Sequence, residues 1–227
     1  YDLYYTHMKW VDGRQVLLCA LYDVTEKKIY QRKMEQQAST DFLTGLYNRM
    51  FCERDLTQYV DKANKVGGKG ALLYLDIDDF KHINDGLGHQ YGDVLLKSIS
   101  SSLQSIKGIE NTCYRMGGDE FVIIIPPDKH DRMEQMITSI KEVFLKPWFL
   151  KEDDYYCTMS MGIVEFPTDD DAANDLIKKA DIAMYEAKKG GKNRIVHYTD
   201  SFGIKSGKRL DMEKNMRDAS AKGYHEF

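Results

Sequence analysis

Short apolar runs alternate along the chain with longer segments in which apolar residues recur every three or four positions. The short runs predict buried strands, and the wider spacing predicts amphipathic helices. Strands are expected at residues 71–76, in a hairpin at 112–125, in a long strand or strand pair at 155–166, and at 194–198. Helices are expected at residues 49–66, 89–106, 128–145 and 171–189, with a helical turn at 80–84. The alternation predicts an α/β (α+β) fold with a central, mostly antiparallel sheet flanked by helices.

The first 24 residues show a different pattern. An aromatic-rich segment, Tyr1–Val11, is followed by Asp12-Gly13 and by the apolar segment Gln15–Val24. Because glycine supplies the backbone angles of a tight hairpin turn, this pattern predicts two paired strands. Two strands alone cannot bury both of their faces. They are therefore either the end of a larger domain or a terminal hairpin that packs on the main domain.

The segment Glu26–Ser39 is polar and favours a helix, with a narrow apolar stripe along one side. The spacing of Asp23 and Glu26 suits a capping box at the start of that helix. A narrow stripe on a charged helix is typical of a short coiled coil. A solvated connector would show the same pattern, so both interpretations stay open.

Composition narrows the possible function classes. The 227 residues carry a net charge of −4, which gives no sign of a nucleic-acid-binding surface. The four cysteines are scattered without metal-ligand spacing, and Cys113 and Cys157 are expected to be buried apolar residues. No run approaches the length of a membrane span, and no signal peptide is visible. The first residue is not methionine, so we expect a piece of a longer, cytoplasmic protein whose other parts include any membrane anchor.

Two acidic clusters carry the candidate chemistry. Asp119 and Glu120 follow Gly117-Gly118 at the tip of the predicted hairpin, where adjacent carboxylates repel each other. A second cluster, Asp76–Asp79, follows the predicted strand 71–76. Hard divalent cations take oxygen ligands, so carboxylates from a strand end and a neighbouring hairpin tip would form a metal site. A solvated acidic turn is the simpler interpretation of the hairpin cluster when it is taken alone.

Four ordered motifs, spanning residues 40 to 198, resemble the GGDEF family of diguanylate cyclases. They are Asp41-Phe42-Leu43-Thr44-Gly45-Leu46-Tyr47-Asn48-Arg49; Leu75-Asp76-Ile77-Asp78 with Phe80-Lys81, Ile83-Asn84-Asp85, Gly88-His89 and Gly92-Asp93; Arg115-Met116-Gly117-Gly118-Asp119-Glu120-Phe121; and Ala180-Asp181-Ile182-Ala183-Met184-Tyr185 with Ala187-Lys188 and Gly191-Lys192-Asn193-Arg194. The resemblance implies the palm-like fold of nucleotidyl cyclases and polymerases. It also implies condensation of two GTP molecules into cyclic di-GMP with release of pyrophosphate.

The resemblance assigns roles to individual residues. Asp76, Asp119 and the main-chain carbonyl of Ile77 are expected to bind Mg²⁺ or Mn²⁺, with Asp119 helping to deprotonate the attacking hydroxyl and Glu120 in support. The residues expected to bind substrate are Lys81, Asn84, His89, Asp93, Gly117, Gly118, Lys188 and Lys192. Of these, Asn84 and Asp93 match the guanine-reading positions, with His89 lining the same region. Lys188 and Lys192 match positions that reach the terminal phosphates.

Other positions of the motifs have structural expectations. Asp41 and Arg49 are expected to hold the opening segment against the core. Asp78 and Asp79 are expected to cap the next helical turn or to lie in water. Many relatives carry Arg-x-x-Asp nine residues before the first glycine of the tip, where this chain has Gly108-Ile109-Glu110-Asn111. Since glycine cannot pair with a phosphate, we expect no product inhibition through this site.

The expected organisation has four parts. Residues 1–24 resemble the end of a PAS sensor domain, 25–40 a signalling linker, 41–200 the GGDEF domain, and 201–227 the lead-in to an EAL phosphodiesterase domain. Catalysis would need a homodimer, which can be transient, since each domain presents one GTP. The alternatives are a GTP-binding module that regulates an attached EAL domain and a pure interaction domain. No nucleic-acid or membrane contact is expected.

Overall fold

The computed structural model describes residues 1–26, 28 and 39–202. The chain divides into two compact units, Tyr1–Thr40 and Asp41–Phe227. Most of the predicted linker helix and residues 203–227 of the predicted tail lie outside the described residues. Within the described part, no helix is long and apolar enough to cross a membrane.

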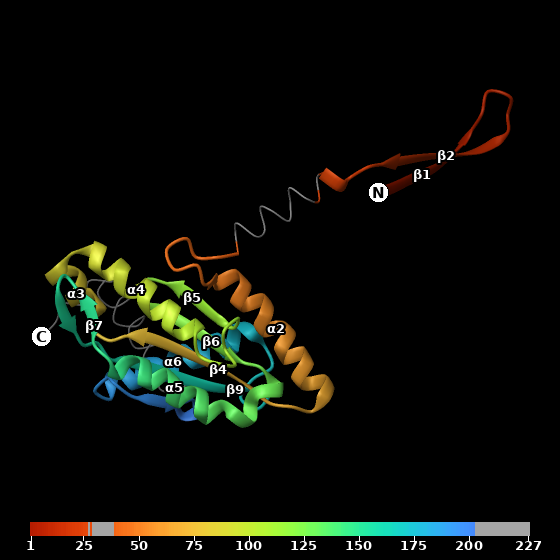
Figure 1. Ribbon diagram of the computed structural model, residues 1–227. Helices are drawn as coiled ribbons and strands as arrows, with labels where there is room; N and C mark the ends of the chain where they lie inside the picture. The colour runs from red at the N-terminus through yellow and green to blue at the C-terminus, as the bar shows by residue number, and fades with distance from the viewer. Residues whose placement is uncertain (27, 29–38, 203–227) are drawn as a thin grey trace, which may run out of the picture. The chain divides into compact units, whose positions relative to one another are not determined.

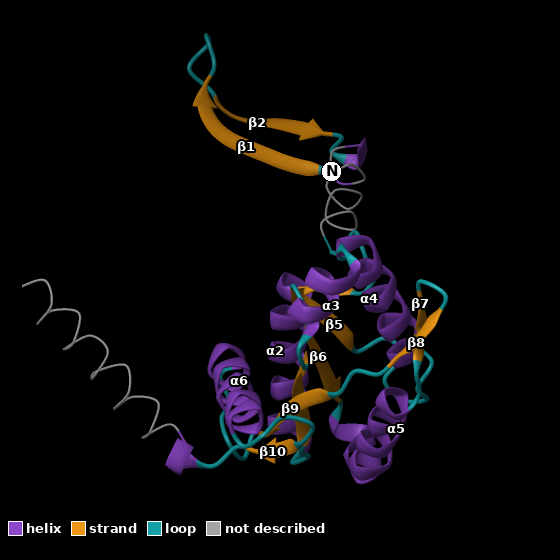
Figure 2. Ribbon diagram, turned by 90° about the vertical axis from the view of Figure 1, so that its left-hand side faces the viewer, coloured by secondary structure: helices purple, strands orange, loops and turns teal. Residues whose placement is uncertain are grey.

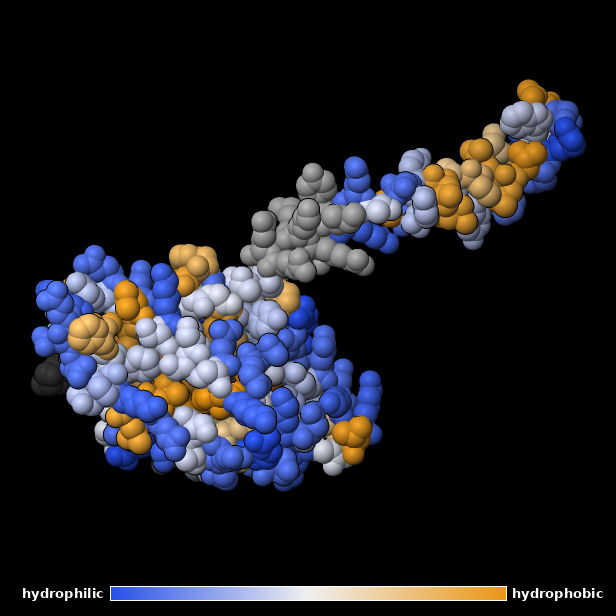
Figure 3. Space-filling view, in the orientation of Figure 1, coloured by the Kyte–Doolittle hydropathy of each residue, from blue (hydrophilic) through white to orange (hydrophobic). Residues whose placement is uncertain are grey.

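The first unit contains the predicted hairpin. Strand β1 (Asp2–Lys9) pairs antiparallel with β2 (Gln15–Tyr22). Large apolar side chains of this ribbon are exposed, among them Leu3 and Tyr4, which as neighbours in a strand point to opposite faces. Figure 3 shows apolar side chains along the side of the ribbon that faces the viewer. The hairpin therefore buries neither face within its own unit, as expected for two strands alone.

The second unit is built on a six-stranded sheet in the order β10-β9-β4-β6-β5-β3. The strands are β3 (Tyr47–Asn48), β4 (Gly70–Ile77), β5 (Cys113–Gly117), β6 (Glu120–Ile125), β9 (Met159–Phe166) and β10 (Ile195–His197). Pairing is antiparallel from β9 through β5 and parallel at the two edges. The predicted mostly antiparallel sheet is confirmed. A separate hairpin, β7 (Trp148–Leu150) with β8 (Asp153–Tyr155), was not predicted as a unit because its strands have three residues each.

Helices cover both faces of the sheet. They are α2 (Arg49–Val66), α3 (Phe80–Leu87), α4 (His89–Gln104), α5 (Met133–Leu145) and α6 (Ala173–Lys189), with a 3-10 helix at Pro127–Arg132. The domain therefore has three layers, with α2 and α6 on one side and α3, α4 and α5 on the other (Figures 1 and 2). The helix predicted at 128–145 is divided into the 3-10 helix and α5, and the turn predicted at 80–84 extends to Leu87.

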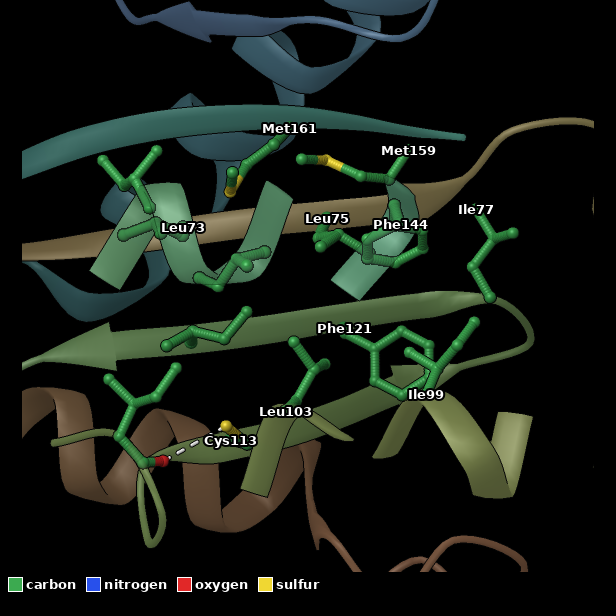
Figure 4. Close-up of a cluster of buried hydrophobic side chains, with 14 of the residues drawn as sticks. Leu73, Leu75, Ile77, Ile99, Leu103, Cys113, Phe121, Phe144, Met159 and Met161 are labelled. Atoms are coloured by element: carbon green, nitrogen blue, oxygen red, sulfur yellow. Dashed lines mark hydrogen bonds between the residues drawn. The ribbon is translucent and has the colours of Figure 1, made fainter. Parts of the chain in front are cut away.

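Strand β4 lies at the centre of the core, and all eight of its residues are buried. Because successive side chains of a strand point to opposite faces, alternate residues enter different clusters. Leu73, Leu75 and Ile77 pack toward α4 and α5 (Figure 4). Leu72 and Tyr74 pack toward α2 and α6. Burial on both faces explains why the segment is a continuous apolar run rather than an alternating one.

A buried carboxylate ties the end of β4 to two later segments. Asp78 is 4% exposed. Its Oδ1 accepts a hydrogen bond from Ser160 Oγ at 2.7 Å, and its Oδ2 accepts from Thr158 Oγ1 at 2.7 Å and from the main-chain N–H of Asn193 at 2.9 Å. Asp78 thereby holds the turn after α6 against the strand ends.

The expectation that Asp78 caps a helix or lies in water is therefore wrong. Local sequence could not show its partners, because they follow 80 to 115 residues later. Asp79 is exposed as expected, yet it makes no side-chain cap bond to α3. Its carboxylate instead pairs with Lys192 Nζ at 2.6 Å.

Gly162 sets the distance between β9 and α6. A Cβ at this position would overlap the carbonyl oxygen of Ala180 and the main-chain nitrogen of Met184. Since these are backbone atoms of a packed helix, moving them aside would cost much stability.

We expect Gly162→Ala to lower the free energy of unfolding by about 1–3 kcal/mol in urea denaturation. Gly86→Ala, which meets no atom within 4 Å, should leave stability unchanged or higher. Equal stability of the two variants would contradict the close packing.

The two adjacent aspartates provide a second matched pair. Asp78→Ala removes the acceptor of three hydrogen bonds and leaves their donors without a partner. We expect it to lower the free energy of unfolding by about 2–4 kcal/mol. Asp79→Ala removes an exposed ion pair and should change stability little. Urea denaturation of both variants checks this order, and the reverse order would refute the role assigned to Asp78.

Candidate active site

The end of β4 meets the tip of the β5–β6 hairpin. Asp76 lies opposite Glu120 in the antiparallel register of β4 and β6. The main-chain N–H of Ile77 donates to the carbonyl of Asp119 at 3.3 Å. The structure thus brings together the two acidic clusters that are separate in the sequence. Gly117 and Gly118 have φ angles of 143° and 52°, which a residue with a side chain rarely adopts, and so they form the turn.

Asp76 is a buried carboxylate with one oxygen paired and the other unpaired. Its side chain approaches Lys188 of α6, with Oδ2 2.6 Å from Nζ, while Oδ1 is buried without a hydrogen-bond partner. Burial raises the pKa of Asp76 to about 6, the hydrogen bond from Lys188 opposes this, and the charges of Asp119 and Glu120 add to the rise. The carboxylate therefore lies where a cation would relieve both its burial and the repulsion from its neighbours.

The donors at this point suit a hard divalent ion. Asp76 supplies an unpartnered buried oxygen, Asp119 a nearby carboxylate, and Ile77 is the last residue of β4. No group of three or more His, Cys, Asp or Glu side chains that could hold a metal occurs among the described residues. Two carboxylates and a main-chain carbonyl would leave the remaining ligand positions for water or phosphate oxygens, as is usual for Mg²⁺.

Tyr74 orients Glu120, a role that no feature of the local sequence pattern predicted. Its hydroxyl donates to Glu120 Oε2 at 3.0 Å. Burial and the charge of Glu120 raise the pKa of the Tyr74 hydroxyl, which keeps it a donor. Tyr74 lies two residues before Asp76 and so on the same face of the strand, which is the signal that could have identified it.

Arg115 joins the tip of the hairpin to the start of the domain. Its side chain is 9% exposed and its Nη1 lies 2.8 Å from Asp41 Oδ1. Its Nε and Nη2 donate to the carbonyl of Gly118 at 3.0 and 2.7 Å. Asp41 also accepts from the main-chain and side-chain donors of Thr44. The expectation that Asp41 holds the opening segment is thus met through Arg115, which sequence reasoning had left unassigned.

Arg49 does not play the part expected of it. Its Nε instead pairs with Glu53 Oε1 at 2.9 Å, one turn further along its own helix. Its side chain is largely exposed. Such an i,i+4 pair supports the start of α2 rather than the contact of the opening segment with the core.

The lysines expected to bind phosphate come from two parts of the chain: Lys188 and Lys192 from the end of α6 and the turn after it, and Lys81 from α3. Lys188 contacts Asp76, and Lys192 contacts Asp79 just before α3. Lys81 is exposed in the first turn of α3. Lys188 and Lys192 are therefore placed beside the acidic strand end, where each could exchange its carboxylate partner for a phosphate.

The residues expected to recognise guanine lie on the helical pair α3–α4. Asn84 is on α3, and its Oδ1 is buried without a hydrogen-bond partner. His89 and Asp93 are exposed on the first two turns of α4. An unsatisfied buried amide oxygen costs stability unless it gains a hydrogen-bond partner.

The segment that replaces Arg-x-x-Asp has structural contacts instead. The carbonyl of Gly108 accepts from Lys129 Nζ at 2.7 Å, and Ile109 is fully buried. Absence of product inhibition through this segment stays a prediction.

Comparison with known proteins places this geometry in a family. The model of the family described as "Diguanylate cyclase, GGDEF domain" matches residues 38–194. The diguanylate cyclase DgcP of Pseudomonas aeruginosa is 33% identical over 195 residues, covering 83% of this chain and 29% of that protein. The cyclic di-GMP phosphodiesterase PdeR of Escherichia coli is 32% identical over 205 residues, covering 89% of this chain and 30% of that protein.

Solved structures agree with the sequence relatives. The coiled coil and GGDEF domain of DgcB from Caulobacter crescentus, in complex with c-di-GMP, superposes with a TM-score of 0.67 at 28% identity, covering 77% of this chain and 93% of that one. The GGDEF domain of PA1120 from Pseudomonas aeruginosa gives a TM-score of 0.64 at 30% identity, covering 69% and 98%. The chain spans less than a third of PdeR and of DgcP. On these grounds the chain belongs to the diguanylate cyclase, GGDEF-domain family.

Proposed function

We propose that this domain is a diguanylate cyclase that condenses two GTP molecules into cyclic di-GMP and releases pyrophosphate. The observation that carries the proposal is the buried, half-paired carboxylate of Asp76, which lies beside Asp119 at an intact hairpin tip. A buried carboxylate oxygen without a partner has little structural use, because it destabilises the fold unless a donor or a cation meets it; Lys188 meets only Oδ2 of Asp76, and Oδ1 stays available.

Each condensation forms a bond between a 3′-oxygen and an α-phosphorus and breaks the bond from that phosphorus to the pyrophosphate. Asp76, Asp119 and the carbonyl of Ile77 would hold Mg²⁺ or Mn²⁺. The ion, when bound, would offset the negative charge that develops on the phosphate oxygens. A carboxylate oxygen of Asp119 would accept the proton of the attacking hydroxyl, and Glu120, oriented by Tyr74, would support it.

The remaining residues would bind and orient the nucleotide. Lys188 and Lys192 would bind the terminal phosphates, and Lys81 would assist from the start of α3. Because Gly117 and Gly118 have no side chains, the nucleotide could closely approach their backbone. Asn84 and Asp93 would bind the pairing edge of guanine, with His89 alongside. Because each domain would present one GTP, a homodimer with two sites face to face would complete the reaction.

We further propose that the flanking segments belong to a sensor and an effector. The exposed apolar faces of the β1–β2 hairpin suit the end of a larger sheet domain of the PAS type. Residues 201–227 would lead into an EAL domain. Such a protein would act in the cytoplasm, where GTP is available.

A second candidate function is a GTP-binding module that regulates an attached phosphodiesterase. It is favoured by the similarity to PdeR, whose name is that of a phosphodiesterase. Both functions use the same nucleotide site, and they differ in whether GTP is consumed.

Turnover with GTP and magnesium distinguishes the two functions. We expect the chain to produce cyclic di-GMP and Asp119→Ala to reduce the rate at least about a hundredfold, because it loses a carboxylate at the reacting atoms. Asp175→Ala, which removes an exposed aspartate paired with Lys178 on α6, should keep the full rate. Binding of GTP without product would favour the regulatory module. Product from Asp119→Ala at the rate of the unmodified chain would refute the assigned site.

Asp76 predicts a pH dependence of metal binding. Its pKa in the metal-free protein is raised from 3.8 to about 6, so the folded state holds a proton there that the unfolded chain releases at lower pH. A metal must displace that proton, and its affinity therefore rises with pH through this value. We expect Mn²⁺ to bind about tenfold more tightly at pH 7 than at pH 5, as measured by electron paramagnetic resonance. The control variant Asp79→Ala should show the same pH dependence of Mn²⁺ affinity. An affinity of the unmodified chain that does not change between pH 5 and pH 7 would contradict the prediction.

A further inference from the structure

The buried amide oxygen of Asn84 lies against a glycine of the neighbouring helix. A Cβ built on Gly92 of α4 would overlap Asn84 Oδ1, and it would lie 3.0 Å from Asn84 Cγ and 3.1 Å from Phe80 Cζ. Oδ1 itself is buried and has no hydrogen-bond partner. The amide therefore occupies space that exists only because residue 92 has no side chain.

The backbone gives no other reason for glycine at this position. Gly92 lies in the second turn of α4, and its φ is not in the left-handed region. Glycine within a helix is less favourable than alanine, so an unconstrained position would be more stable with a Cβ. The close approach of α3 explains the glycine.

We propose that Gly92 is a specificity-determining positioning residue, which fixes the amide of Asn84 and thereby the preference of the site for guanine. This inference rests on the proposed function, in which Asn84 recognises the base. Gly92 need not touch the nucleotide. Its lack of a Cβ leaves the space between α3 and α4 that the Asn84 amide occupies.

The identity of the overlapping atom determines what a substitution would do. Asn84 Oδ1 is the far end of a side chain, so a Cβ at residue 92 would turn the amide aside rather than displace a backbone. The fold should therefore survive Gly92→Ala, whereas the base-reading amide should not keep its position. Gly162 offers the contrast, because the atoms that a Cβ would meet there belong to the backbone.

Calorimetric binding of 3′-deoxy-GTP and 3′-deoxy-ATP with magnesium tests the inference, since neither nucleotide has the attacking hydroxyl. We expect Gly92→Ala to weaken binding of the guanine nucleotide at least about tenfold and to change binding of the adenine nucleotide less than about twofold. Gly86→Ala is the matched control on α3, because its Cβ would meet nothing within 4 Å. It should bind both nucleotides as the unmodified chain does, and both variants should melt no lower than that chain.

A double-mutant cycle assigns the effect to Asn84. In an Asn84→Ala background, adding Gly92→Ala should weaken binding of 3′-deoxy-GTP less than about twofold, because the displaced group is already absent. An equal loss in both backgrounds would overturn the inference, as would a Gly92→Ala variant that unfolds or keeps its guanine preference. Failure of the unmodified chain to bind 3′-deoxy-GTP would refute the proposed function, and the inference with it.

Discussion

The site depends on one electrostatic constraint, which is a carboxylate held at the buried end of the central strand. Asp76 is 4% exposed, and only one of its oxygens is paired. Desolvation and two neighbouring carboxylates oppose its ionisation, so the position destabilises the fold by itself. Strand β4 tolerates this cost because all eight of its residues are buried between two helical layers. The cost of a buried charge at the candidate site is thus offset by packing elsewhere in the strand.

Two polar contacts, one made by the mostly buried side chain of Arg115 and one by the buried carboxylate of Asp78, turn that strand end into a site of defined shape. Arg115 binds the Gly118 carbonyl and the Asp41 carboxylate, which fixes the hairpin tip relative to the opening segment. Asp78 binds the N–H of Asn193, which fixes the turn that carries Lys192. In both contacts a charged group that is buried or mostly buried has several hydrogen-bond partners, which is the condition under which burial of charge is tolerated. The candidate nucleotide site is therefore bordered by loops that the core holds in place.

Helix packing contributes at the other end of the site. Gly162 lets α6 approach β9 and so brings Lys188 to Asp76, and Gly92 lets α4 approach Asn84. In each case a glycine without a Cβ leaves room for the close packing that positions a polar side chain, Lys188 in the first case and Asn84 in the second. The position of the phosphate-binding and base-binding candidates is thus set by close packing as much as by the loops.

Much of the fold could be predicted from the sequence because its signals are local. The helix predicted at 49–66 matches α2, and the hairpin at the acidic tip follows from Gly117-Gly118 between two apolar runs. The motifs also indicated Asp76 and Asp119 as partners. The two three-residue strands β7 and β8 lacked enough residues to show a period. The roles of Tyr74 and Arg115 were missed, because a tyrosine in an apolar strand and an arginine before a turn carry no distinctive local pattern.

The sequence by itself determined the order of the elements, the family and the set of candidate residues, since hydrophobic period, turn residues and motif spacing can all be read within a few positions. Only the tertiary structure decided which carboxylates are buried and what they bind. Asp78 is buried while Asp79 is exposed, although the two are adjacent. Burial and pairing depend on segments up to 115 residues away, and the packed sheet brings these segments together.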